Sequence, residues 1–111
     1  FLANLKMSGF SKKTTVIKGR SQIELRKLPM NFFDIIYIDG SHVARDVLAD
    51  AVLSWELLKK GGVMIFDDYH LYEGDRPVTL RPQIAIDSFL AAFSPVIEVI
   101  HKDRQVILRK L

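Results

Sequence analysis

The chain has 111 residues, 49% of them hydrophobic and 26% charged, which predicts one small folded domain and excludes a disordered segment. No apolar run approaches the roughly 20 residues that span a bilayer, and the lack of cysteine excludes a disulfide scaffold, a thiolate zinc site and a cysteine nucleophile. Seven Lys or Arg residues and one Glu lie in the first 33 residues, but without the interleaved aromatic residues typical of nucleic-acid binding. We therefore expect no nucleic-acid or membrane partner, and a cytoplasmic location.

The first third of the chain predicts short elements separated by glycine and proline. Residues 1–8 are typical of the end of a helix that stops at Gly9, and the β-branched run 14–18 predicts a short strand. A helical turn is expected over 22–28. The run 32–38 is apolar without alternation, which predicts a strand covered on both faces of a parallel sheet.

A long amphipathic helix is expected next, because apolar residues recur at spacings of three and four from Val43 to Leu58. Ser41 is expected to cap its start, and Gly61 to close its end in the left-handed conformation. The polar face should carry Arg45, Asp46, Asp50 and Glu56, and Lys59 and Lys60 should stabilise the negative end of the helix dipole.

A second apolar strand over 63–66 completes a strand–helix–strand unit, whose strands should be parallel and whose crossover should be right-handed. A polar loop then leads to a helix over 81–93. Strands over 96–100 and 105–108 should form an antiparallel hairpin. The sequence predicts a single α/β domain over the whole chain, with a mostly parallel sheet, a C-terminal antiparallel hairpin and flanking helices.

Both predicted inner strands end in carboxylates, with Asp39 after the first and Asp67 and Asp68 after the second. The carboxyl ends of adjacent parallel strands meet at one edge of a sheet, where ligands bind in open α/β folds. Three carboxylates that close repel one another unless a cation intervenes, so Mg²⁺ is one interpretation. The alternative is that these residues cap turns and helices.

His42 follows Asp39 by three residues and should lie at the same edge, where a neutral imidazole could act as a general base. Capping or simple surface exposure is the alternative. His70 has a similar position beside Asp68, whereas His101 in the terminal hairpin is expected to have no special role.

Three segments carry a resemblance to a known family. They are residues 16–22 (VIKGRSQ), residues 33–42 (FDIIYIDGSH) and residues 57–69 (LLKKGGVMIFDDY). Together they resemble the second half of a class I S-adenosylmethionine-dependent methyltransferase with a Rossmann-like fold, from the bacterial group related to catechol-type O-methyltransferases. The resemblance extends over nearly the whole chain.

The resemblance implies roles for individual residues. Gly19, Ser21 and Gln22 match the turn that lines the adenine pocket of catechol-type enzymes, and Asp39 is grouped with them as a cofactor-side residue. Asp39, Asp67 and Asp68 match the Mg²⁺ ligands, although asparagine is common at the last position. His42 stands where those enzymes have a lysine base, so His42 and Asp39 are the expected catalytic residues.

The resemblance also implies an activity: transfer of a methyl group from S-adenosylmethionine to a hydroxyl of a small-molecule acceptor, assisted by Mg²⁺. The family's glycine-rich cofactor loop has no counterpart here and would lie upstream of Phe1, so residues 1–111 are expected to be the C-terminal portion of the domain. Alone, they should bind cofactor poorly and lack activity, and they should either self-associate or rearrange the strand over 14–18, which has lost its neighbours. The alternatives are a non-catalytic α/β scaffold or interaction module and a receiver-type Mg²⁺-binding regulatory domain.

Overall fold

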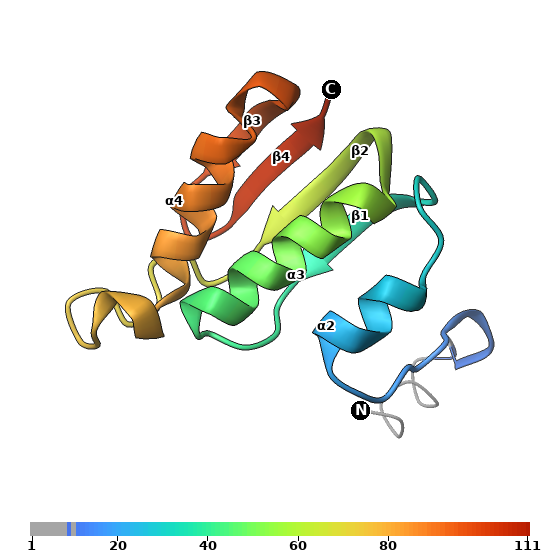
Figure 1. The fold of residues 1–111 in the computed structure, drawn as a ribbon, viewed down its shortest axis with the longest axis horizontal. Helices are drawn as coiled ribbons and strands as arrows, with labels where there is room; N and C mark the ends of the chain where they lie inside the picture. The colour runs from blue at the N-terminus through green and yellow to red at the C-terminus, as the bar shows by residue number, and fades with distance from the viewer. Residues whose placement is uncertain (1–8, 10) are drawn as a thin grey trace.

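The computed structural model describes Gly9 and residues 11–111, and its centre is a four-stranded sheet (Figure 1). The strands lie in the order β1-β2-β4-β3. Their bounds are Phe33–Ile38 (β1), Leu58–Phe66 (β2), Ile97–Lys102 (β3) and Val106–Lys110 (β4). The α-helices are α2 (Ser21–Glu24), α3 (Ala44–Leu57) and α4 (Pro82–Ala92), and 3-10 turns occupy Ser11–Lys13, Leu25–Lys27, Val78–Leu80 and Ser94–Val96.

The sheet is mixed. β1 and β2 are parallel and are joined through α3, whereas β4 is antiparallel to both β2 and β3. The expected α/β class and the terminal hairpin are therefore confirmed. After β2, the long loop and α4 lead the chain to the far edge of the sheet, where β3 lies, and β4 then inserts between β2 and β3 (Figure 1).

The hydrophobic core lies between the sheet and the two long helices, α3 and α4, which cover the same side of it (Figure 1). Phe89 of α4 is fully buried at its centre, 5.6 Å from the ring of Phe66 on β2 and 5.9 Å from Trp55 on α3, measured between ring centroids. Phe93 stacks on Phe89 at 4.2 Å. These aromatic contacts hold both helices at a defined position over the strand ends.

Two expectations about the first strands are wrong. Residues 14–18 form no strand, and β1 is not covered on both faces, because Ile35 and Tyr37 are 63% and 48% exposed. Among the described residues β1 is an edge strand, and the side of it that faces away from α3 is packed against no helix. The expectation that the chain self-associates stays a prediction.

The end of α3 also differs from expectation. The helix stops at Leu57 and β2 begins at the next residue, so Gly61 does not close the helix but lies inside a bulge of β2 with φ of 80°. The cation at the helix end is Lys110 of β4, whose Nζ donates to the carbonyl oxygens of Trp55 at 2.8 Å and Leu58 at 2.9 Å. The expected role of Lys59 and Lys60 thus belongs to a residue from the opposite end of the chain.

Other expectations about α3 need correction in detail. The N-cap position is Val43 and not Ser41, although the Ser41 hydroxyl accepts a hydrogen bond from the Val43 N–H at 3.1 Å. Asp50 was expected on the solvated face, but it is only 8% exposed because α2 packs over it. The expected helix over 1–8 lies outside the described residues. In the part of the chain that the structure describes, no helix has the length and apolarity needed to cross a bilayer.

Candidate active site

The acidic residues converge at the carboxyl ends of β1 and β2, as the sequence predicted. Ile38 and Phe66 are paired across the two strands, so Asp39 and Asp67 leave the sheet from neighbouring positions. The backbone N–H of Asp67 still donates to the carbonyl of Ile38 at 3.3 Å. This is the edge at which ligands bind in open α/β sheets.

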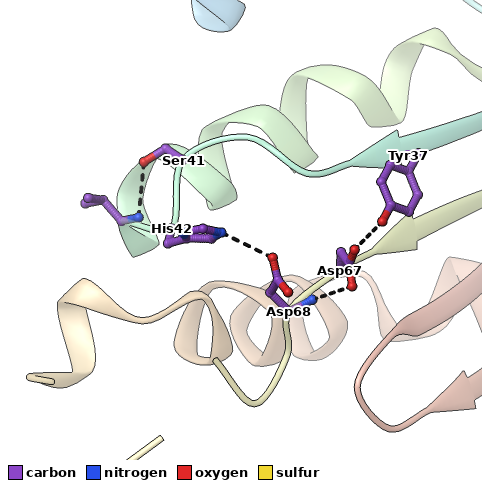
Figure 2. A network of polar contacts seen from close by, with 6 residues as sticks. Tyr37, Ser41, His42, Asp67 and Asp68 are labelled. Carbon is purple, nitrogen blue, oxygen red and sulfur yellow. Dashed lines mark hydrogen bonds and ion pairs between the residues drawn. The ribbon is translucent and has the colours of Figure 1, made fainter. Parts of the chain in front are cut away.

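Asp39, His42 and Asp68 form a cluster at this edge. One ligand atom from each lies within 4.8 Å of the other two, and Nε2 of His42 is 3.2 Å from Oδ2 of Asp68 (Figure 2). Asp68 has φ of 62°, a left-handed conformation that is uncommon outside glycine and tolerated by aspartate. The chain therefore turns sharply between Asp67 and Asp68, and the two neighbouring carboxylates point in different directions (Figure 2).

Asp67 is bonded to Tyr37 and not to the cluster. The Tyr37 hydroxyl donates to Oδ2 of Asp67, and the Asp68 N–H donates to Oδ1 of Asp67 at 2.8 Å (Figure 2). The hydrogen bond from Tyr37 holds the pKa of the Asp67 carboxyl below its usual range, and the same bond, with the nearby negative charge, raises the pKa of Tyr37 to about 12. Asp67 is thus a carboxylate with both oxygens already engaged.

Sequence reasoning missed Tyr37, although a signal for it exists. Residues at alternate positions of a strand share a face, so Tyr37 and Asp39 leave β1 on the same side. The strand pairing then places Tyr37 next to Ile65 and within reach of Asp67.

Two of the predicted cofactor-side residues, Ser21 and Gln22, begin the short helix α2, which packs against α3. Ser21 Oγ donates to Oδ1 of Asp50 at 2.6 Å, and Gln22 Nε2 donates to Oδ1 of Asp46 at 3.3 Å. Burial raises the pKa of Asp50, while the hydrogen bond from Ser21 partly opposes that rise. The turn before α2 requires Gly19, which has φ of 141° and whose added Cβ would lie 2.9 Å from the Glu24 carboxylate.

Two cavities flank the cluster. One, of about 400 Å³, contains two of the predicted cofactor-side residues, Ser21 and Asp39, but neither Gly19 nor Gln22 lines it. The other cavity, of about 550 Å³, is lined in part by Asp67 and Asp68. Its remaining lining residues are His70, Leu71, His101, Asp103, Arg104 and Gln105.

The second cavity is polar, and the two histidines that line it come from different parts of the chain. Nδ1 of His70 is 2.7 Å from a carboxylate oxygen of Glu73, and Nε2 of His70 is 3.5 Å from Asp103. His101, for which the sequence suggested no role, contributes from the terminal hairpin. An acidic sheet edge between two cavities is the place at which ligands bind in α/β folds of the Rossmann-like class.

Comparison with known families agrees with this class and narrows it. The family model described as a methyltransferase domain matches residues 1–69, and the chain therefore belongs to the methyltransferase-domain family. A protein of Acanthamoeba polyphaga mimivirus, R132, is 43% identical over 42 residues, which is 38% of this chain and 19% of that protein.

Solved structures share the fold. A Corynebacterium glutamicum protein matches 97% of this chain with a TM-score of 0.79 and 15% identity. The SAH-bound methyltransferase PaMTH1 of Podospora anserina matches 98% with a TM-score of 0.72 and 19% identity, and the O-methyltransferase NovP matches 93% with a TM-score of 0.64 and 19% identity. The chain spans 53%, 54% and 42% of these three proteins, respectively.

Proposed function

We propose that the protein containing this chain transfers a methyl group from S-adenosylmethionine to a hydroxyl of a small molecule, with a divalent cation at the acidic edge of the sheet. The observation that carries the proposal is the convergence of Asp39, His42 and Asp68 between two cavities. Family membership and the SAH-bound and O-methyltransferase structures of the same fold support it.

The cavity lined by Ser21 and Asp39 is the proposed cofactor side. Gly19 shapes the turn that leads into α2, and Ser21 and Gln22 are held in place by their bonds to α3. These bonds anchor α2 against α3, so the adenine contact proposed for Ser21 in this cavity would be made by a side chain that already has a fixed orientation. The contact proposed for Gln22, which does not line the cavity, rests on the family resemblance.

The donor set of the cluster fits a divalent cation. Asp39 and Asp68 bring two negative charges close together in a half-exposed position, an arrangement that a bound cation would stabilise. We propose that Asp39 and Asp68 hold that cation. When bound, it would supply a positive charge that lowers the pKa of the acceptor hydroxyl and orients its oxygen.

The cavity lined in part by Asp67 and Asp68 is the proposed binding site of the methyl acceptor. His70, His101 and Gln105 offer hydrogen-bonding groups to a small hydroxylated molecule there. Methyl transfer by displacement needs the acceptor oxygen held in line with the methyl group, so the contribution of this chain is mainly to position the acceptor. An imidazole in the place of His42 can accept the hydroxyl proton or bind the cation, and both roles require an unprotonated Nε2.

The test uses the longest available form of the protein and methyl-labelled S-adenosylmethionine with a panel of small hydroxylated acceptors. Asp39→Ala should abolish labelling of the acceptor, whereas Asp34→Ala, at the exposed start of β1, should leave it unchanged. Labelling that survives Asp39→Ala, or that continues in excess chelator, would contradict the proposed role of the cation. If the folded protein labels none of the acceptors, the result contradicts the proposed methyl transfer itself.

A further inference from the structure

We propose that Tyr69 is a positioning residue for the methyl acceptor, because it joins the two segments that form the walls of the acceptor cavity and so fixes the distance between them. The inference rests on the proposed function in taking the cavity of about 550 Å³ as the acceptor site. It gives a role to a buried side chain that does not itself line that cavity.

The cavity has two walls that come from different parts of the chain. Every residue that lines it belongs either to the segment 67–71 after β2 or to the segment 101–105 in the β3–β4 hairpin. The sheet brings these segments near each other, because Phe66 at the end of β2 pairs with Val106 at the start of β4. That pair is the last of the ladder, so the distance between the walls depends on contacts beyond the strands.

Tyr69 makes those contacts with both its backbone and its side chain. Its N–H donates to the carbonyl oxygen of Arg104 at 2.9 Å. Nζ of Lys102 lies 5.2 Å from the centroid of the Tyr69 ring, and a hydrogen bond to the phenol raises the pKa of Lys102 above its usual value. One residue of the first wall is thus bound twice to the second wall.

The phenol of Tyr69 also ties both walls to the core. Its hydroxyl donates to Oδ1 of Asp87 on α4 at 2.6 Å, and Nζ of Lys102 is 3.6 Å from the same oxygen. Phe89, two residues further along α4, is fully buried at the centre of the core. Tyr69, Asp87 and Lys102 therefore form a network of three elements whose helix cannot easily move.

The network acts on the acceptor cavity and not on the cofactor side. Asp68 and His70 flank Tyr69 in the chain, so a shift of Tyr69 moves two lining residues with it. None of the network residues lines the cavity that contains Ser21. Since in-line displacement is sensitive to misplacement of the acceptor by about 1 Å, we expect loss of the network to affect the acceptor and not the cofactor.

The test compares two Michaelis constants in the longest available form of the protein. The acceptor is whichever of catechol, glycerol and methyl glucoside the parent labels fastest with methyl-labelled S-adenosylmethionine. Tyr69→Phe keeps the ring and the backbone bond but removes the hydroxyl. It should raise KM for the acceptor by about threefold to tenfold and change KM for S-adenosylmethionine by less than about twofold.

Two variants on the other side of the bond sharpen this test. Asp87→Asn keeps an oxygen that accepts from Tyr69, so its acceptor KM should stay within about twofold of the parent value. Asp87→Ala removes that oxygen and should reproduce the effect of Tyr69→Phe. Lys60→Met, on the exposed part of β2, is the control for a substitution outside the network.

Hydrogen exchange provides a readout that needs no acceptor. In Tyr69→Phe, exchange of the Tyr69 N–H should become faster, whereas the N–H groups of α3 should exchange as in the parent. Unchanged acceptor KM in Tyr69→Phe overturns the inference, as does a fall in kcat with both KM values unchanged, because that pattern indicates only a smaller folded fraction. A folded parent that labels none of the three acceptors contradicts the proposed function instead, and the inference fails with it.

Discussion

Replacing Lys110 with methionine tests how the end of α3 is stabilised. The Lys110 ammonium donates to two carbonyl oxygens at 2.8 and 2.9 Å and lies 4.7 Å from the centroid of the Trp55 ring. Methionine keeps most of the apolar stem and removes the charge and both donors. The variant therefore isolates the polar contribution of the side chain from its packing.

The expected loss follows from those contacts. A hydrogen bond to a charged group contributes about 1.5–3 kcal/mol, and a cation at a helix C-terminus about 0.3–1 kcal/mol. The two bonds share one ammonium and are not additive, so we expect Lys110→Met to lower the free energy of unfolding by about 2–3 kcal/mol. For a chain of this size, that loss corresponds to a fall in Tm of roughly 10 °C.

The measurement is urea unfolding followed by circular dichroism, with fluorescence of the single tryptophan, Trp55, as a second probe. Lys60→Met is the matched control, because Lys60 is exposed in β2 and should contribute less than about 0.5 kcal/mol. Equal losses in the two variants, or a Lys110→Met loss under 0.5 kcal/mol, would refute the argument that Lys110 caps α3.

Two further substitutions test other parts of the fold. Burial raises the pKa of Asp50, so the folded state disfavours its charge, and stability should fall as pH rises from the ordinary aspartate range through that raised pKa. Asp50→Asn can still accept from Ser21, so it should be more stable than the parent at pH 7 and should flatten the pH dependence of thermal unfolding; a loss at pH 7 with the slope unchanged would contradict this. Gly62→Ala should cost about 1–3 kcal/mol in urea unfolding, because its Cβ would lie 2.7 Å from Cδ1 of Leu58; a variant as stable as the parent would show that the β2 bulge yields easily.

The parts of the candidate site that could be predicted were those set by chain periodicity. Two apolar runs ending in Asp39 and Asp67 predict parallel strands, and parallel strands bring their carboxyl ends to one edge. His42, three residues after Asp39 at the start of a helix, was expected at that edge and lies there. Local sequence determines these placements because strand ends and helix starts follow from which residues can be buried.

What could not be predicted were orientations and partners. Asp67 and Asp68 are neighbours in sequence, yet the positive φ of Asp68 and the bond from Tyr37 point their carboxylates apart. Asp50 was expected in solvent because helical periodicity does not reveal that α2 packs over it. In each case the partner comes from another element, so the pattern of one element alone does not reveal the contact; for Tyr37 it also takes the pairing of β1 with β2.

By itself, the sequence determined the α/β class, the order of the main elements and the residues that gather at the sheet edge, because burial of apolar faces and the exits of strands are local properties. The tertiary structure decided which carboxylate Tyr37 engages, which lysine caps α3 and which face of β1 is left uncovered. Lys110 shows the reason most clearly. It reaches the carbonyl of Trp55, 55 residues earlier in the chain, only because β4 inserts beside β2, and such a contact exists only once the sheet has formed.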